Sequence, residues 1–311
     1  MGAAVVVLRP GFFTTVQDLG RRGHQASGVS VSGAMDTGAH NQANRLVGNA
    51  PTVATLEVTL TGPELQFEDE RPIGVAGAEF ELTLDGRGVP MNAAIDVAPG
   101  SRLAFGARLR GARAYVAIAG GVETPIVLGS RSTHVASGLG GLDGRALRRE
   151  DRLALGKPET VPHMPGLARG VGPAHSSEAV RVLPGPDLDL LENGAFEALV
   201  DGAYTIDTDS NRMGYRLRGG ALRARSAATK LSEPVSFGTI QVTPSGQPVL
   251  LMADCPTSGG YPVIANVITA DLDILGQLAP GDTLRFAVCS RDEARSAAWT
   301  RARALAAMEP R

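Results

Sequence analysis

Along most of the chain, apolar residues recur in short runs that have the length and residue types of β-strands. Glycine, proline and other turn residues separate these runs at short intervals, which is typical of barrels and sandwiches and not of alternating βαβ units. The pattern predicts a mainly β fold. The expected strands cover residues 3–8, 54–60, 73–75, 80–84, 102–105, 114–118, 180–183, 236–242, 248–253 and 283–288.

Four segments carry the spacing of amphipathic helices instead: residues 36–47, 187–200, 269–278 and a C-terminal segment that begins at Ser290. In the first, apolar side chains share one face, and a glycine follows as a stop signal. In the last, Glu293 stands three residues after Ser290, which is the spacing of a capping box. A few helices are therefore expected beside the strands.

The strand pattern disappears between Lys157 and Glu178, in a stretch rich in proline and glycine. This break predicts a linker at residues 157–178 between an N-terminal β domain, residues 1–156, and a C-terminal β domain, residues 179–311, with a terminal helix. Residues 96–105 and 277–286 each contain a Pro-Gly turn that leads into a strand. This echo fits two related β domains, and it also fits the general frequency of such turns.

The chain has 311 residues, of which 43% are hydrophobic, and this is enough for a large core in one or two domains. Charged residues make up 20% and the formal net charge is −2, which gives no electrostatic case for nucleic acid or an anionic membrane as a partner. No apolar run approaches the roughly 20 residues that span a bilayer. The two cysteines, Cys255 and Cys289, argue against a disulfide scaffold, so a cytoplasmic location is expected.

Several standard motifs are absent from the sequence. There is no phosphate-binding G-x-x-x-x-G-K-[ST] loop, no C-x-x-C and no H-E-x-x-H, so neither an ATP site of that type nor a metal site is supported. The stretch GLGGLDG, residues 138–144, lacks the third glycine of a dinucleotide-binding loop, and no helical pattern follows it. We interpret it as a tight turn.

Four polar loops that contain glycine remain as candidates for binding, at residues 14–36, 128–133, 210–217 and 254–261. The first leads into a predicted helix, whose N-terminal amides could hold an anion. In the second, Arg131 lies between hydroxyl side chains and suits a carboxylate or phosphate. In the fourth, Gly259 and Gly260 allow close approach of the backbone. Each loop alone could be a capped surface turn, whereas all four together favour a shared polar cleft.

Together these stretches resemble a known family, described as the C subunit of 5-oxoprolinase or as biotin-dependent carboxyltransferase, which includes allophanate hydrolase subunit 2-like and KipA-like proteins. The resemblance covers nearly the whole chain. The chain departs from the family pattern at Pro256, where glutamine is usual, and at Phe237-Gly238, where Pro-Gly is often found. The matching segments are residues 15–36, 43–49, 56–63, 114–121, 127–133, 210–219, 232–272 and 280–286, and they include the motifs TVQDLGRRGHQASGVSVSGAMD and SNRMGYRLRG.

The resemblance implies two linked β-barrel domains of cyclophilin-like architecture. It also implies that the protein acts with a KipI-like B subunit and an A subunit, which together open the lactam of 5-oxoproline to give glutamate with hydrolysis of ATP. ATP would be used by the assembled complex. The chain itself carries no motif for a metal site or for covalent biotin.

On the matching positions, Asp254 is expected to orient an amide N–H or to act as a base, and Lys230 is the second candidate catalytic residue. The backbone amides of Gly259 and Gly260 would hold developing negative charge. Asn211 and its neighbour Arg212 would bind a carboxylate. The full set of candidate substrate-binding residues is Ser32, Asp36, Arg131, Asn211, Arg212, Thr257, Gly259, Gly260 and Tyr261.

Two other functions fit the same resemblance. The module occurs in urea carboxylase as a carboxyltransferase domain, so the chain could transfer a carboxyl group to an amide or to urea, or serve an allophanate- or urea-amidolyase-type enzyme. Biotin would then arrive on another chain. The chain could also be a non-catalytic, KipA-like regulator that binds a KipI-like partner.

Overall fold

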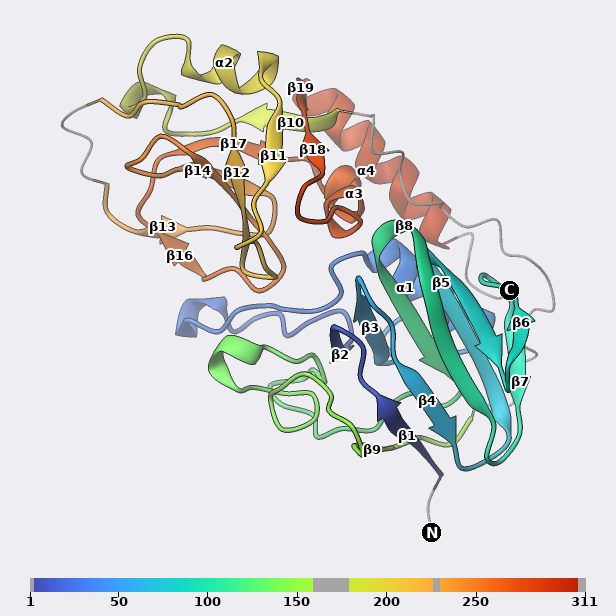
Figure 1. Ribbon diagram of the computed structural model, residues 1–311. Helices are drawn as coiled ribbons and strands as arrows, with labels where there is room; N and C mark the ends of the chain where they lie inside the picture. The colour runs from blue at the N-terminus through green and yellow to red at the C-terminus, as the bar shows by residue number, and fades with distance from the viewer. Residues whose placement is uncertain (1–2, 159–178, 226–229, 307–311) are drawn as a thin grey trace. The chain divides into compact units, whose positions relative to one another are not determined.

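The computed structural model describes residues 3–158, 179–225 and 230–306 and shows a chain built mainly of β-strands, with a few helices (Figure 1). These residues divide into two compact units. Unit 1 comprises residues 3–22, 32–158 and 305–306, and unit 2 comprises residues 23–31, 179–225 and 230–304. The expected fold class, mainly β with two barrel-like units, is confirmed. None of the described helices is long and apolar enough to cross a bilayer.

Unit 1 is built on one antiparallel sheet that curves into a half-barrel. The main path of the sheet is β2-β3-β8-β4-β1-β9, and β5 pairs with β8 and with the short strands β6 and β7. The strands are β1 (Ala4–Arg9), β2 (Phe13–Gln17), β3 (Thr55–Thr59), β4 (Glu64–Phe67), β5 (Arg71–Leu84), β6 (Arg87–Val89), β7 (Ala94–Val97), β8 (Arg102–Ile118) and β9 (Arg152–Ala154).

The two faces of this sheet bury different partners. Successive side chains of a strand point to opposite faces, so Val116 of β8 enters the main core of unit 1 while Tyr115 and Ala117 join a second cluster with helix α1 (Thr37–Leu46). A Cβ at Gly74 of β5 would lie 2.8 Å from the Cβ of Leu46 in α1. Glycine at this position therefore lets the helix approach the sheet closely.

Strands β5 and β8 are each continuous where the apolar pattern predicted two strands. β5 joins the expected strands at 73–75 and 80–84, and β8 joins those at 102–105 and 114–118. The ladder between them shifts its register three times in the stretch from Gly77 to Leu82, so bulges carry the pairing onward. Residues 106–110 of β8 are exposed. Solvent exposure of a paired strand, and not a turn, interrupted the apolar pattern.

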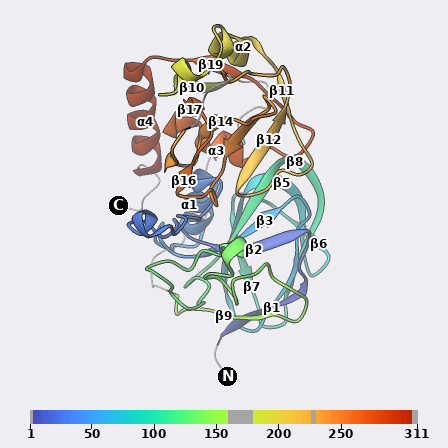
Figure 2. The same ribbon diagram turned by 90° about the vertical axis from the view of Figure 1, so that its left-hand side faces the viewer.

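Unit 2 contains a nearly closed barrel, and several of its strands are labelled in Figure 2. Its strand order is β18-β11-β12-β15-β14-β17-β10-β19. All pairs in it are antiparallel except β10 with β19. A separate two-stranded ladder joins β13 (Glu233–Pro234) to β16 (Ser258–Gly259). The barrel strands are β10 (Val180–Pro184), β11 (Tyr204–Ile206), β12 (Gly214–Arg218), β14 (Thr239–Val242), β15 (Pro248–Leu251), β17 (Val263–Val267), β18 (Thr283–Leu284) and β19 (Phe286–Val288).

The capping box predicted at Ser290 is confirmed, and the first helix also has a side-chain cap. Asp36 caps α1, because its Oδ1 accepts a hydrogen bond from the Ala39 amide at 2.8 Å. Helix α4 (Arg291–Ala306) opens with the predicted capping box, in which the Ser290 amide donates to Glu293 Oε2 at 2.7 Å and the Glu293 amide donates to Ser290 Oγ at 3.2 Å. No residue of α4 is fully buried.

The expected continuous helix at residues 187–200 is wrong. A short 3-10 turn (Leu188–Leu190) is followed by α2 (Ala195–Asp201). Leu191 forms an isolated β-bridge with Ala224, and Gly194 has a φ of 82°, so the chain leaves the helical path between the two pieces. The expected helix at 269–278 is present as a 3-10 turn (Thr269–Asp271) that continues into α3 (Leu272–Gly276).

One segment of the N-terminal half belongs to unit 2. Residues 23–31 group with that unit, whereas residues on either side of them group with unit 1. Ser30 Oγ donates a hydrogen bond of 2.8 Å to the carbonyl oxygen of Cys255 and so ties the segment to the loop after β15. A single boundary near residue 157 does not describe this exchange, and from residue 159 onward the expected linker lies outside the described residues.

Candidate functional site

A buried salt bridge joins two of the candidate loops in unit 2. β12 and β15 are neighbours in the barrel, so Arg212 before β12 meets Asp254 after β15. Arg212 Nε donates to Asp254 Oδ2 and Arg212 Nη2 donates to Asp254 Oδ1, each at 2.9 Å. The two side chains are only 7% and 6% exposed. Because the guanidinium engages both carboxylate oxygens, the geometry favours Asp254 as a fixed support of its loop over an open general base.

The glycine pair after Asp254 does not form the left-handed turn of an amide nest. Neither Gly259 nor Gly260 has a positive φ. Gly259 is paired with β13, and a Cβ there would lie 2.6 Å from Gln241 Nε2. Gln241 Nε2 in turn donates to the Tyr261 carbonyl at 3.1 Å, while the Tyr261 side chain is 46% exposed. The absence of a side chain at Gly259 therefore leaves space for Gln241, whose hydrogen bond to Tyr261 fixes the loop.

Lys230 stands just before β13 and is enclosed by two carboxylates. Its ammonium group contacts Asp187 and lies 2.8 Å from Glu233 Oε2, and the lysine side chain is 5% exposed. Burial alone would lower the pKa of Lys230, but the hydrogen bonds to Asp187 and Glu233 outweigh it and raise the pKa above its ordinary value. Asp187 also accepts the Val263 amide at 2.8 Å. Lys230 is therefore a fixed cation that connects β13 to the barrel.

The other candidates of unit 2 shape the backbone. Asn211 is exposed, and its Oδ1 accepts the Met213 amide at 2.8 Å, which closes a side-chain turn before β12. Thr257 is half-buried, and its carbonyl accepts the Val235 amide at 3.1 Å. The neighbouring thiol of Cys255 is buried, and burial together with the charge of Asp254 raises the pKa of Cys255 to about 12.

In unit 1 the second candidate loop closes around Asp18. Asp18 Oδ1 accepts hydrogen bonds from Ser130 Oγ at 2.6 Å, Ser132 Oγ at 2.5 Å and the Gly20 amide at 2.8 Å. Asp18 Oδ2 accepts the Arg131 amide at 2.6 Å. Burial alone would raise the pKa of Asp18, but these hydrogen bonds outweigh it and lower the pKa below its ordinary value. Asp18 is therefore a buried carboxylate that orders residues 130–132.

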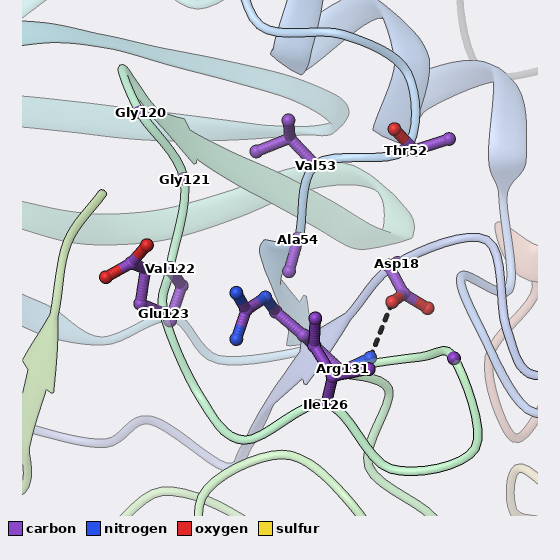
Figure 3. A pocket seen from close by; sticks show the side chains of 11 residues that line it. Asp18, Thr52, Val53, Ala54, Gly120, Gly121, Val122, Glu123, Ile126 and Arg131 are labelled. Carbon is purple, nitrogen blue, oxygen red and sulfur yellow. Dashed lines mark hydrogen bonds between the residues drawn. The ribbon is translucent and has the colours of Figure 1, made fainter. Parts of the chain in front are cut away.

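A small pocket of about 220 Å³ lies beside this cluster (Figure 3). Figure 3 shows the Arg131 guanidinium extending across it toward Val122 and Glu123, while the Arg131 amide is tied to Asp18. The pocket is lined by Asp18, Thr52, Val53, Ala54, Gly120, Gly121, Val122, Glu123, Ile126, Gly129 and Arg131, all of which belong to unit 1.

The first candidate loop has a mainly structural role where the structure shows its contacts. The Asp36 amide donates to Tyr115 Oη at 2.8 Å, and Tyr115 Oη donates to Glu57 Oε2 at 2.7 Å in the interior of unit 1. Ser32 has a φ of 57°, is 6% exposed, and its hydroxyl has no hydrogen-bond partner among the described residues. Asp36 is thus a helix cap. Ser32 carries strain and an unsatisfied polar group.

Two close approaches join candidate residues within unit 2. Arg212 meets Asp254, and the Lys230 carbonyl lies 3.6 Å from the place of a Cβ at Gly260. The expected tight turn at 138–144 is present, with five residues at positive φ, and its Gly141 amide donates to the Arg131 carbonyl at 2.9 Å. No group of three or more His, Cys, Asp or Glu side chains suited to a metal ion occurs within the described ranges.

Several residues that matter in this geometry were not singled out from the sequence. Asp18, Ser130 and Ser132 form the cluster behind Arg131, and Glu123 lines the pocket. One signal was available for the serines: hydroxyl residues flank Arg131 on both sides. Their pairing spans more than a hundred residues, as in the separation of 112 between Ser130 and Asp18, so no local pattern reveals it.

Comparison with known proteins agrees with this architecture. Residues 27–288 match the family described as "Carboxyltransferase domain, subdomain A and B". The chain is 38% identical to the C subunit of 5-oxoprolinase from Escherichia coli (strain K12), over 93% of this chain and 92% of that protein. It is 33% identical to urea amidolyase of Saccharomyces cerevisiae, over 94% of this chain but only 17% of the yeast protein.

A solved structure gives the same result. The crystal structure of the urea amidolyase of K. lactis superposes with a TM-score of 0.89 at 33% identity, covering all of this chain and 20% of that one. The chain thus spans about a fifth of the urea amidolyase and nearly the whole of the 5-oxoprolinase C subunit. With a family match over most of its length, the chain belongs to the carboxyltransferase domain family that comprises subdomains A and B and includes the C subunit of 5-oxoprolinase.

Proposed function

We propose that this chain is the C subunit of an ATP-dependent 5-oxoprolinase and works with a KipI-like B subunit and an A subunit to open 5-oxoproline to glutamate. The observation that carries the proposal is the two-way coverage with the known C subunit of 5-oxoprolinase, since the two chains match over almost their full lengths. The urea amidolyase of Saccharomyces cerevisiae matches over only 17% of its own length.

The geometry of unit 2 favours a supporting role for residues around the loop that follows β15. The Arg212–Asp254 pair fixes the start of this loop, Gln241 fixes its end, and the Lys230 segment pairs alongside it. In this proposal Asp254 and Lys230 hold the loop in place. Thr257 and the exposed Tyr261 are the residues of the loop that contact substrate. Such rigid support is what a site needs when reacting groups must be held in register.

Reconstitution tests the proposal. The chain is purified with the A and B subunits of the same source, and ATP hydrolysis is measured with and without 5-oxoproline, together with glutamate release. Stimulated ATP hydrolysis that matches glutamate release, and that vanishes when this chain is left out, is the expected result. The proposal fails if the three-subunit mixture forms a complex but hydrolyses ATP independently of 5-oxoproline.

The family match favours carboxyl transfer as the second candidate function. The same preparation is offered carboxylated biotin on a carrier protein with urea or 5-oxoproline as acceptor. Transfer of labelled carboxyl to urea, without coupling of ATP hydrolysis to 5-oxoproline, would replace the first proposal with this one.

A further inference from the structure

The pocket of unit 1 is lined by polar groups whose hydrogen-bonding capacity is not fully used by contacts within the unit. Its volume, about 220 Å³, is below the range of about 300–1,000 Å³ typical of sites for drug-sized ligands, so it suits a small metabolite. Val53, Ala54 and Val122 supply apolar walls, and Arg131 and Asp18 supply opposite charges (Figure 3). A ligand that fits must therefore satisfy both an anionic and an N–H function on a compact apolar body.

Arg131 is the cationic group in this pocket. Among the described residues, its guanidinium forms no ion pair or hydrogen bond, although the Arg131 amide is fixed by Asp18. Most of the other buried or half-buried arginines of unit 1 behave differently, as in the pairing of Arg71 with Asp69 and of Arg145 with Asp151. An arginine whose backbone is fixed and whose guanidinium N–H groups have no partner can bind a carboxylate with two parallel hydrogen bonds.

Asp18 supplies the acceptor. Three hydrogen bonds converge on its Oδ1, but only the Arg131 amide reaches Oδ2. A carboxylate oxygen has two lone pairs, so Oδ2 retains room for one more N–H donor. The surrounding hydroxyls prevent rotation of the carboxylate. Asp18 is thus an acceptor that is already oriented before a ligand arrives.

We propose that the pocket between Arg131 and Asp18 binds a small carboxylate that carries an N–H group next to its carboxylate, with the carboxylate on Arg131 and the N–H on Asp18 Oδ2. Lactam carboxylates and α-amino acids share this chemistry. Under the function proposed above, on which the choice of ligand rests, these are the substrate 5-oxoproline and the product glutamate.

Four probes separate the two contacts by calorimetric titration of the full chain. 5-Oxoproline and L-glutamate carry both groups, 2-pyrrolidinone lacks the carboxylate, and tetrahydrofuran-2-carboxylate lacks the N–H. Arg131→Gln is compared with Arg149→Gln, a matched control in unit 1 whose side chain is 79% exposed. Asp18→Asn tests the acceptor, and melting curves establish that each variant is folded.

A charge-assisted contact of this kind is worth about tenfold or more in affinity. Arg131→Gln should weaken 5-oxoproline binding by at least that factor, leave 2-pyrrolidinone unchanged, and differ in this from Arg149→Gln. Asp18→Asn should weaken 5-oxoproline but not tetrahydrofuran-2-carboxylate. The ratio between 5-oxoproline and L-glutamate identifies which of the two sources the pocket prefers.

The Michaelis constant for 5-oxoproline in the three-subunit complex gives the second readout. If Arg131→Gln changes neither binding to the chain nor this constant, the pocket assignment is wrong, even when the complex is active and the proposed function stands. If the chain binds 5-oxoproline through Arg131 but the complex shows no coupled turnover, the proposed function fails and the pocket assignment remains.

Discussion

The salt bridge between Arg212 and Asp254 makes a strong prediction about stability. Asp254→Asn keeps the size of the side chain but removes the charge that balances the guanidinium of Arg212. The two side chains are 7% and 6% exposed, so solvent cannot replace the lost partner. Breaking a buried pair by removing one member costs about 3–5 kcal/mol. For a unit of this size, that corresponds to a fall in melting temperature on the order of 10 °C.

Chemical denaturation of the full chain provides the measurement. Circular dichroism follows both units, and the fluorescence of Trp299, the only tryptophan of the chain, reports on unit 2. Asp209→Asn is the matched control, because this aspartate is exposed in the same unit and should move the midpoint by less than about 0.5 kcal/mol. The double variant Arg212→Met with Asp254→Leu should recover most of the loss, since apolar residues of similar size often replace a buried pair without penalty.

Two results would refute this reasoning. One is an Asp254→Asn variant as stable as the control, which would mean that the pair is open to water in solution. The other is a double variant as unstable as the single one. A stable Asp254→Asn chain that loses 5-oxoproline-dependent turnover would instead support the direct catalytic role that the sequence suggested.

Three further predictions follow from buried polar groups. Tyr115→Phe removes a hydroxyl that donates to Glu57 and should cost about 1–3 kcal/mol in urea denaturation, whereas Tyr204→Phe, whose buried hydroxyl has no partner among the described residues, should cost almost nothing. Equal losses would contradict this. The lowered pKa of Asp18 means that its stabilising contribution is complete above its ordinary value of 3.8 and is lost as pH falls through the lower value of the folded state, so the stability gap between wild type and Asp18→Asn should be about 2 kcal/mol or more at neutral pH and shrink in acid. A gap independent of pH down to acid unfolding would exclude that cause. Because the pKa of Cys255 is raised to about 12, its thiol should resist iodoacetamide at pH 8 in the folded chain and react readily after denaturation, and rapid labelling of the native chain would show that the thiol is accessible.

Local signals in the sequence predicted local structure well. The capping box of Ser290 and Glu293 needs only a few neighbouring residues, and it forms as expected. The segment 187–200 failed because its helical pattern competes with a contact from outside the segment, the bridge between Leu191 and Ala224. Tertiary pairing outweighed local propensity there.

The candidate site shows the same difference between local features, which the sequence predicts, and long-range contacts, which it does not. Four polar loops could be recognised from composition, but their pairing depends on which strands are neighbours. Arg212 and Asp254 are 42 residues apart and meet only because β12 lies beside β15. Arg212 was expected to bind the carboxylate of a ligand. In the structure it binds a carboxylate of the chain itself, that of Asp254. The open guanidinium is that of Arg131, and no spacing rule distinguishes these two arginines.

Residues 23–31 belong to unit 2 although their neighbours in sequence belong to unit 1, and this affects both the synthesis of the protein and its division into fragments. During synthesis, residues 23–31 leave the ribosome long before the strands of unit 2, which begin at residue 180. The segment therefore cannot pack into unit 2 until those strands have been made. A fragment that begins after the expected linker would lack Ser30 and its bond to the Cys255 carbonyl. No single cut therefore releases unit 2 intact. A fragment for the study of unit 2 alone would need residues 23–31 supplied in trans or grafted through a new connection.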